Sequence, residues 1–252
     1  MIANYHTHTK RCNHAIGDER EYIEHAIRGG IQTLGFADHA PMPFPDGYNS
    51  GFRMQVEEIA EYFETLRALK KEYENDIRIL IGFEAEYYPD VFEDFLAHIE
   101  PFSPDYLIMG QHALDNEVNA HFPSRATDDP ALLKKYVDQV ITGLSTGKFL
   151  YHAHPDMMNF IGDESVYRAE TLRYLTFCKE HHIPIEINLL GMMESRWYPR
   201  EDFWQMAGEV GNTAIIGCDA HQPTVLSDVE LHQKGEKWAE RFGVSLVANP
   251  IL

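Results

Sequence analysis

Residues 2–8 read Ile-Ala-Asn-Tyr-His-Thr-His, a short apolar run that ends in two histidines separated by one residue. Alternate side chains of a β-strand point to the same face, so both imidazoles at the end of this strand reach one region of space. Later apolar runs also end on potential metal ligands, namely His39, Glu84, His112, His154, Asp219 and His221. Because a barrel gathers the carboxyl ends of its strands at one rim, this recurrence predicts a multinuclear metal site.

Segments with strand and helix character alternate along the whole chain. The predicted strands are residues 2–6, 33–37, 77–84, 105–110, 149–153, 184–189 and 213–217. The predicted helices are residues 19–28, 54–74, 90–99, 130–145, 166–181, 200–209 and 226–242. This alternation indicates parallel strands with right-handed crossovers, either closed as a barrel or open as a doubly wound sheet. Ligands from six of the seven strands must converge, and a barrel brings them together, so we predict an α/β barrel.

Composition excludes several classes of protein. A length of 252 residues suits one domain of barrel size. The formal charge of −19 argues against a nucleic-acid partner. No apolar run approaches the roughly 18 residues of a membrane span, and the first residues lack the features of a signal peptide. Three widely spaced cysteines indicate neither a disulfide framework nor a cysteine zinc site. We therefore predict a cytoplasmic protein with no membrane partner, whose oligomeric state the sequence does not reveal.

Some candidate ligands leave alternatives open at this level. Glu84 and Glu86 lie two residues apart and share one face of the third strand, so periodicity does not choose between them. His14 follows His8 by six residues and is either a ligand to a neighbouring metal or a solvated loop residue. His152 shares a face with the ligand candidate two residues later, but lies one layer deeper, and we expect it to be a packed core histidine.

The order of these motifs resembles that of the polymerase-and-histidinol-phosphatase (PHP) family. The motifs are His-x-His, Asp-His, Gly-x-Glu, a lone His, His-Pro and Asp-x-His, and they extend from residue 6 to residue 221. Within the family, the chain resembles the histidinol-phosphatase branch in His-Thr-His-Thr at 6–9, His-Pro-Asp at 154–156, Glu-Ile-Asn-Leu at 186–189 and Arg-Trp-Tyr-Pro at 196–199. The resemblance implies one metallophosphatase domain over residues 1–252, folded as a distorted, TIM-like (β/α)7 barrel with the metals at the C-terminal ends of its strands.

The resemblance also implies up to three metal ions and the division of their ligands. One metal takes His6, His8, Glu84 and Asp219; a second shares Glu84 and takes His112 and His154; a third takes His14, His39 and His221. Glu84 is chosen over Glu86 because it occupies the Gly-x-Glu position. A ligand set rich in histidine with a shared carboxylate suits zinc, manganese or iron.

Such a site is suited to hydrolysis of a phosphate monoester. Two metals that share Glu84 can bridge a water, lower its pKa to give hydroxide, and neutralise charge on the phosphoryl oxygens. The predicted catalytic residues are Glu84, Asp219 and His39, with Asp219 or a nearby histidine carrying the proton to the leaving oxygen. The resemblance implies L-histidinol phosphate as the substrate, and so a step of histidine biosynthesis.

A dianionic phosphate favours guanidinium groups, whose planar fork matches its oxygens. Arg196 and Arg200 follow the sixth predicted strand, and Arg125 lies in the loop after the fourth. We predict these three as substrate-binding residues. Glu117 and Asn119 of that same loop are the candidates for contact with an imidazole ring.

Three alternatives compete with this interpretation. The first is a phosphatase or phosphodiesterase of the same family that acts on another small phosphate ester or a nucleotide. The second is a polymerase-associated module, which the acidic charge and the absence of a basic patch disfavour. The third is a metal-storing or sensory protein, because ligands alone do not demonstrate turnover. Chelator-sensitive phosphate release separates these alternatives.

Overall fold

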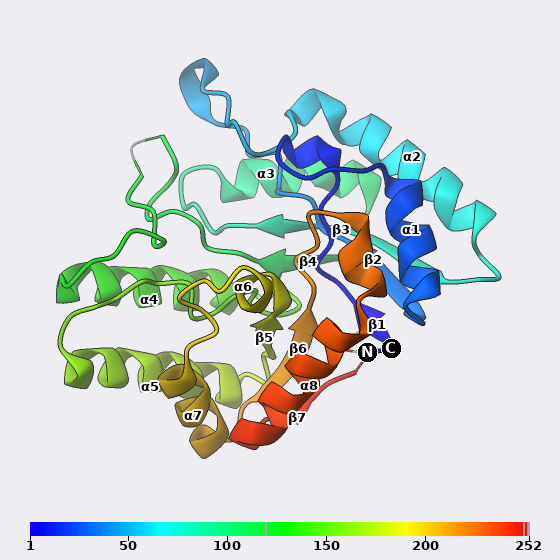
Figure 1. Cartoon of the computed structure of the whole chain (residues 1–252). Helices are drawn as coiled ribbons and strands as arrows, with labels where there is room; N and C mark the ends of the chain where they lie inside the picture. The colour runs from blue at the N-terminus through cyan, green and yellow to red at the C-terminus, as the bar shows by residue number, and fades with distance from the viewer. Residues whose placement is uncertain (119, 249, 251–252) are drawn as a thin grey trace.

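The computed structural model describes residues 1–118, 120–248 and 250, and it consists of parallel strands surrounded by helices (Figure 1). Strands β1 (Ala3–Asn4), β2 (Thr33–Phe36), β3 (Arg78–Ala85) and β4 (Tyr106–Met109) form a parallel sheet in that order. Strands β5 (Ile185–Asn188), β6 (Thr213–Gly217) and β7 (Ser245–Leu246) form a second parallel sheet. The four-stranded sheet is curled into half of a barrel, as the predicted α/β class requires.

Isolated β-bridges join the two sheets at two junctions. At one junction, His152 pairs with Met109 at the end of β4 and with Ile185 at the start of β5. At the other, Thr7 pairs with Ala220, beyond the ends of β1 and β6. All of these bridges are parallel. Neighbouring residues extend both junctions: the backbone of residues 150–153 hydrogen-bonds to β4 and to the start of β5, and His6 and His8 both hydrogen-bond to Ala220.

The predicted strand at residues 149–153 was wrong as a regular strand, because only His152 of this segment forms bridges. The segment ends two residues later, where His154 adopts a left-handed backbone with φ of 32° directly before a proline. Strand β7 was not predicted, because its two residues are exposed and too few to show an apolar period. The other six predicted strands each overlap a strand of the structure.

Helices cover the outside of the curled sheets (Figure 1). They are α1 (Glu19–Arg28), α2 (Ile59–Glu72), α3 (Phe92–Ile99), α4 (Pro130–Ser145), α5 (Glu164–Glu180), α6 (Leu189–Met193), α7 (Glu201–Val210) and α8 (Val229–Phe242). Short 3-10 turns occupy Lys10–Cys12, Pro45–Gly47, Val56–Glu58, Glu100–Phe102 and Pro223–Ser227. Each predicted helix overlaps one of these helices, and the short α6, which follows β5 directly, was not predicted.

Local sequence signals set several helix ends. Helix α1 begins at a capping box, in which Asp18 accepts from the backbone of Glu21 and the Glu21 side chain accepts in return. Helices α7 and α8 end at Gly211 and Gly243, both in the left-handed conformation that glycine adopts without a Cβ clash. Trp204 of α7 is fully buried, as expected of a core residue. In the described part of the chain, no helix combines the length and the apolar character that a membrane crossing needs.

Candidate metal centre

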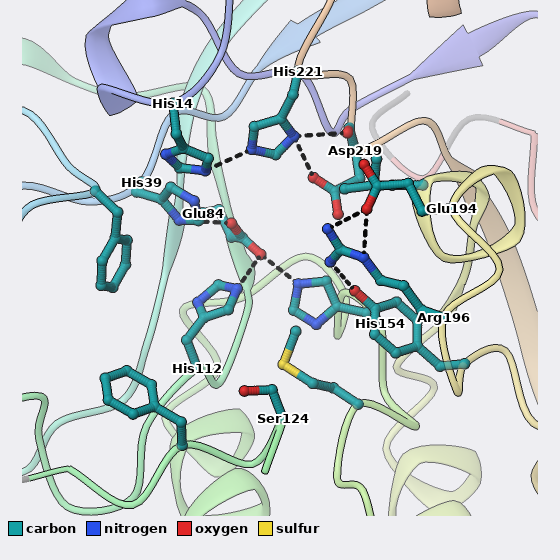
Figure 2. A pocket seen from close by; sticks show the side chains of 15 residues that line it. His14, His39, Glu84, His112, Ser124, His154, Glu194, Arg196, Asp219 and His221 are labelled. Carbon is teal, nitrogen blue, oxygen red and sulfur yellow. Dashed lines mark hydrogen bonds and ion pairs between the residues drawn. The ribbon is translucent and has the colours of Figure 1, made fainter.

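All nine predicted ligands converge on one region, next to a cavity of about 400 Å³ (Figure 2). Seven of them line the cavity: His14, His39, Glu84, His112, His154, Asp219 and His221. His6 and His8 lie beneath this lining and are fully buried. The nine residues come from β3 and from the segments that follow β1, β2, β4, β6 and the His152 bridge.

Glu84 lies at the centre of the cluster. Its carboxylate oxygens are within 3.5 Å of five imidazole nitrogens, those of His154 at 2.8 Å, His39 at 2.9 Å, His6 at 3.4 Å, and His8 and His112 at 3.5 Å. Ligand atoms about 2.1 Å from a common ion lie about 3.0 Å apart in octahedral geometry and about 3.4 Å apart in tetrahedral geometry. The spacing in this cluster is therefore compatible with groups that share metal ions.

The orientation of the ligand atoms also fits bound cations. Nδ1 of His39 and Oε2 of Glu84 are buried and 2.9 Å apart, yet neither has a hydrogen-bond partner among the described residues. Elsewhere in the cluster, pairs of imidazole nitrogens face each other, at 3.1 Å between His6 and His8 and at 2.9 Å between His14 and His221. Buried polar atoms without partners are costly, and a bound cation would satisfy the His39 and Glu84 atoms.

Burial and mutual contact shift the pKa values of the acids and histidines of this cluster, upward for His6 and His112 and downward for several others. Burial would raise the pKa of Glu84, but His112 and its neighbours hold that pKa well below its ordinary value. Burial acts in the same direction on Asp219, and His6 leads the groups that hold the pKa of Asp219 well below its ordinary value. Burial lowers the pKa of His8 to about 3. Both acids are therefore ionised and His8 is neutral near pH 7, the forms that bind metals.

Two carboxylates behind the cluster orient the imidazole rings. Nδ1 of His6 is 2.8 Å from Oε1 of Glu186, and Nδ1 of His112 is 2.8 Å from Oε1 of Glu86. Each carboxylate accepts the Nδ1 proton and so leaves Nε2 free to bind a metal. Glu86, the alternative to Glu84 in the sequence, therefore supports a ligand instead of lying among the ligands.

Glu186 is a buried residue whose importance the sequence did not predict. Besides its contact with His6, it accepts from the backbone of His154 at 3.0 Å and from the side chain of Asn188 at 2.9 Å. Asn188 also donates to Oδ2 of Asp219 at 3.1 Å, so one network fixes three ligand positions. A β-carbon at Gly217 would overlap the Glu186 carboxylate. The signal that could have revealed Glu186 is its alternate spacing with Asn188 on β5.

The backbone is also adapted at the centre. Asp219 has φ of 47° and His154 has φ of 32°, left-handed values that are uncommon for residues with a side chain. Such conformations persist only where the surrounding structure holds them, and they cluster at functional sites. At Gly110, a β-carbon would overlap the carboxylate of Glu84, so only glycine leaves space for this acid.

Arg53 forms a buried ion cluster that sequence reasoning missed. It is 1% exposed and donates to Glu86 at 2.9 and 3.1 Å and to Glu117 at 2.9 and 3.3 Å. Burial raises the pKa of Glu117, although Arg53 opposes that shift. Burial acts likewise on Glu86, but Arg53 and His112 together outweigh the effect of burial and lower the pKa of Glu86. Glu117 therefore binds Arg53 instead of facing the cavity, while Asn119 lies outside the described residues.

Arg196 is the one predicted substrate-binding arginine among the cavity-lining residues. Its Nε donates to Glu194 at 2.8 Å and its Nη1 donates to the hydroxyl of Tyr198 at 2.7 Å. These contacts hold the guanidinium at the wall of the cavity, to one side of the cluster and between Glu194 and His154 in the view of Figure 2. Its place favours a role in binding anions.

The other two arginines lie outside the residues that line the cavity. Arg200 donates to Asp202 at 2.7 Å and to the carbonyl of Phe160 at 2.9 Å, and its guanidinium lies 3.9 Å from the ring centroid of Tyr167. Arg125 is exposed and lies over a phenylalanine ring of its own loop. The sequence placed all three arginines near the site, but it did not show which guanidinium points inward.

His152 is a packed core histidine, as the sequence predicted. It is fully buried and its Nδ1 is 2.8 Å from the hydroxyl of Tyr174. Burial lowers the pKa of His152 to about 3, so this ring is neutral. It forms the bridge between the two sheets one layer below the ligand cluster.

The chain thus combines a parallel α/β fold, half of it curled, with histidines and carboxylates that are gathered at one cavity, which is the arrangement of a candidate metal-binding domain. Residues 4–189 match the family described as "PHP domain". The chain belongs to this family, as its motifs predicted.

Relatives of the chain include named phosphatases. A protein of Deinococcus radiodurans named "probable histidinol-phosphatase" is 29% identical over 230 residues, which cover 88% of this chain and 87% of the relative. The histidinol-phosphatase of Bacillus subtilis is 30% identical over 115 residues, 43% of each chain. Among solved structures, the histidinol phosphate phosphatase of Lactococcus lactis, complexed with zinc, L-histidinol and phosphate, is similar with a TM-score of 0.75. It is 19% identical, with 97% of this chain and 95% of that chain covered.

Proposed function

We propose that this protein is a metal-dependent phosphomonoesterase that hydrolyses L-histidinol phosphate to L-histidinol and phosphate. The observation that carries the proposal is the convergence of nine ligand-type side chains beneath a cavity with Arg196 in its wall. The relative from Deinococcus radiodurans, which aligns over most of both chains, supports the choice of substrate. The alternative is another small phosphate ester as the substrate of the same site.

Three groups of residues are suited to hold metal ions. We assign His6, His8, Glu84 and Asp219 to the first ion, Glu84, His112 and His154 to the second, and His14, His39 and His221 to the third. In the structure, ligand atoms lie within 4.8 Å of one another in overlapping sets of three. Sets drawn from these nine residues include His6, His8 and Asp219; His6, Glu84 and His154; His8, His39 and Glu84; and His14, His39 and His221. When bound, zinc, manganese or iron would polarise a water and neutralise the charge of phosphoryl oxygens.

Asp219 is placed to move a proton during the reaction. Its Oδ2 accepts from Asn188 at 3.1 Å, and its Oδ1 is 3.2 Å from Nε2 of His8. Its pKa lies well below the ordinary value, so Asp219 is ionised, which is the form that a proton acceptor must have at the start of the reaction. We propose that it takes up a proton and passes it to the leaving oxygen. His39, at the opposite side of Glu84, is the second candidate for that role.

Arg196 is proposed to bind the phosphate of the substrate. A guanidinium has five N–H donors, of which Glu194 and Tyr198 occupy three here and leave two for phosphate oxygens. Aromatic and aliphatic side chains line other parts of the cavity, which suits the non-phosphate part of a small ester; they are Phe52, Phe122, Met157 and Leu190. We leave Arg200 and Arg125 out of this set because they do not line the cavity.

We also infer that the six strands β1 to β6 and the His152 segment form one distorted, seven-stranded barrel in a single domain over residues 1–252, with β7 paired to β6 outside it. The parallel bridges at both junctions between the sheets support this inference. A cytoplasmic location and the absence of a nucleic-acid partner stay predictions, which fractionation of cells and a nucleic-acid binding assay would test.

The test is phosphate release from L-histidinol phosphate by the purified protein. We expect activity that a chelator removes and that zinc, manganese or iron restores. The matched control is Glu84→Gln, which keeps the shape of the central ligand but removes its charge and should lose most of the activity. If a panel of other phosphate esters is hydrolysed and L-histidinol phosphate is not, the substrate is wrong while the phosphatase stands. If nothing in the panel is hydrolysed after metal is restored, the proposed reaction is wrong.

A further inference from the structure

A second cavity lies beside the metal centre and shares two residues with it. Its volume is about 430 Å³, and it is bounded by helix α8 on one side and by α6 and the segment after α6 on the other. Arg196 and Tyr198 line both cavities. In Figure 1, α8 and α6 lie on the same side of the strands β5 and β6. An occupant of this cavity would therefore touch the same wall that bounds the metal centre.

The second cavity is strongly cationic in a chain that is strongly acidic. Four of its ten lining residues are lysine or arginine: Arg196, Lys234, Lys237 and Arg241. None of its lining residues is an acid, although the whole chain has 40 acidic and 21 basic residues. Such a local reversal of sign attracts anions, because the field at a concave surface depends on its own lining.

Two of the four cations are free to bind a ligand. Arg196 and Arg241 already form ion pairs, with Glu194 and Glu201. Within the described parts of the chain, neither Lys234 nor Lys237 has an ion pair or a side-chain hydrogen bond. They are three residues apart on α8 and therefore lie on one face of the helix, where both ammonium groups can reach one anion.

The same face of α8 provides an aromatic surface. Trp238 lines the cavity, and its indole N–H is buried without an acceptor among the described residues. Because this N–H is enclosed by protein, Trp238 would contact a ligand through its ring and not through its N–H. Met192 and Pro199 supply apolar surface on the other side of the cavity. The lining thus combines a flat ring, apolar contacts and two unpaired positive charges.

We propose that this second cavity binds a small phosphorylated molecule with a planar ring. The phosphate lies at Lys234 and Lys237, and the ring packs against Trp238. Nucleoside monophosphates and phosphorylated imidazole compounds share this chemistry. The proposal is independent of the reaction at the metal centre, because neither lysine lines that cavity.

The test uses naphthalene-1-sulfonate, whose flat ring and anionic group match the cavity and which a phosphatase cannot hydrolyse. Its binding to the metal-loaded protein is measured by titration calorimetry. The double variant Lys234→Ala/Lys237→Ala should weaken binding by about tenfold or more, since hydrogen bonds to charged groups are lost. The matched control is Lys134→Ala/Lys135→Ala, which removes the same charge from exposed positions on α4.

The result expected is weaker binding in the first double variant and binding within about twofold of wild type in the control. AMP and L-histidinol phosphate are then tested as competitors, with displacement of the probe read within seconds of mixing. Displacement by AMP indicates a nucleotide-like ligand, displacement by L-histidinol phosphate indicates a substrate-like ligand, and either result supports the proposal. The proposal is overturned by any of three results: the wild type does not bind the probe, the two double variants bind it equally, or neither phosphate compound displaces it.

Discussion

Replacing Arg53 by methionine should destabilise the protein strongly. The substitution keeps an unbranched apolar stem above Phe52, which the guanidinium of Arg53 contacts at 4.5 Å from the ring centroid. It removes the four hydrogen bonds that Arg53 donates to Glu86 and Glu117. Glu86 keeps its contact with His112, but Glu117 loses its cationic partner.

The expected loss follows from the burial of this cluster. Breaking a buried ion pair by removing one partner costs about 3–5 kcal/mol, because the remaining charge is uncompensated. For a domain of this size, such a loss lowers Tm by roughly 6–20 °C. The loss should shrink at lower pH. Burial already raises the pKa of Glu117, and without Arg53 that pKa rises further, so the folded variant takes up a proton before the unfolded chain does.

The assay is urea denaturation of the metal-loaded protein at pH 7.5 and at pH 5. Arg28→Met is the matched control, because Arg28 is exposed and its side chain donates to a backbone carbonyl of its own helix. We expect the control to differ from wild type by less than about 0.5 kcal/mol. A loss below about 1 kcal/mol in the Arg53 variant, or a loss that is equal at both pH values, would refute the assignment of a buried, charge-dependent cluster.

Three further predictions concern the metal centre and the core. Gly110→Ala should displace the carboxylate of Glu84 and so lower the metal content, measured by mass spectrometry; a variant with full metal content contradicts this. Asp219→Asn should reduce kcat by about 100-fold or more with little change in KM, and near-normal turnover at full metal content would exclude the proton role. Burial lowers the pKa of His232 in the folded protein, so the unfolded chain takes up this proton first as the pH drops below about 6.5. The free energy of unfolding should therefore fall by up to about 1.4 kcal/mol per pH unit for this one proton. His232→Gln should remove that part of the slope in denaturation curves between pH 7.5 and 5, and an unchanged slope counts against it.

The convergence of the candidate ligands could be predicted because each of them is marked by the sequence directly before it. Each ligand follows an apolar run, and the strand period places His6 and His8 on one side. The packed state of His152 could be predicted for the same reason, from its position one layer below His154. The proposed assignment of ligands to individual ions needed the family resemblance, because spacing alone did not separate Glu84 from Glu86.

What the sequence did not reveal depends on tertiary geometry. Arg53 lies in a loop rich in proline and glycine, and no periodicity shows that it is buried between two acids from other segments. Arg196 and Arg200 are only four residues apart, yet the turn after α6 directs one into the cavity and the other onto Tyr167. The segment at 149–153 has the composition of a strand, but its pairing is cut short by the turn at His154.

The proposed metal ions would also hold together the two sheets at their junctions. Each junction is short: residues 6–8 share a few backbone hydrogen bonds with Ala220, and residues 150–153 share a few with β4 and with the start of β5. Each proposed ligand group takes side chains from segments on both sides of a junction, so every ion would act as a crosslink between the halves of the molecule. Stripping the ions should therefore speed amide hydrogen exchange at both junctions, while the interior of β3 stays protected. The metal ions would then stabilise the barrel against local opening at its junctions, in addition to supporting the reaction.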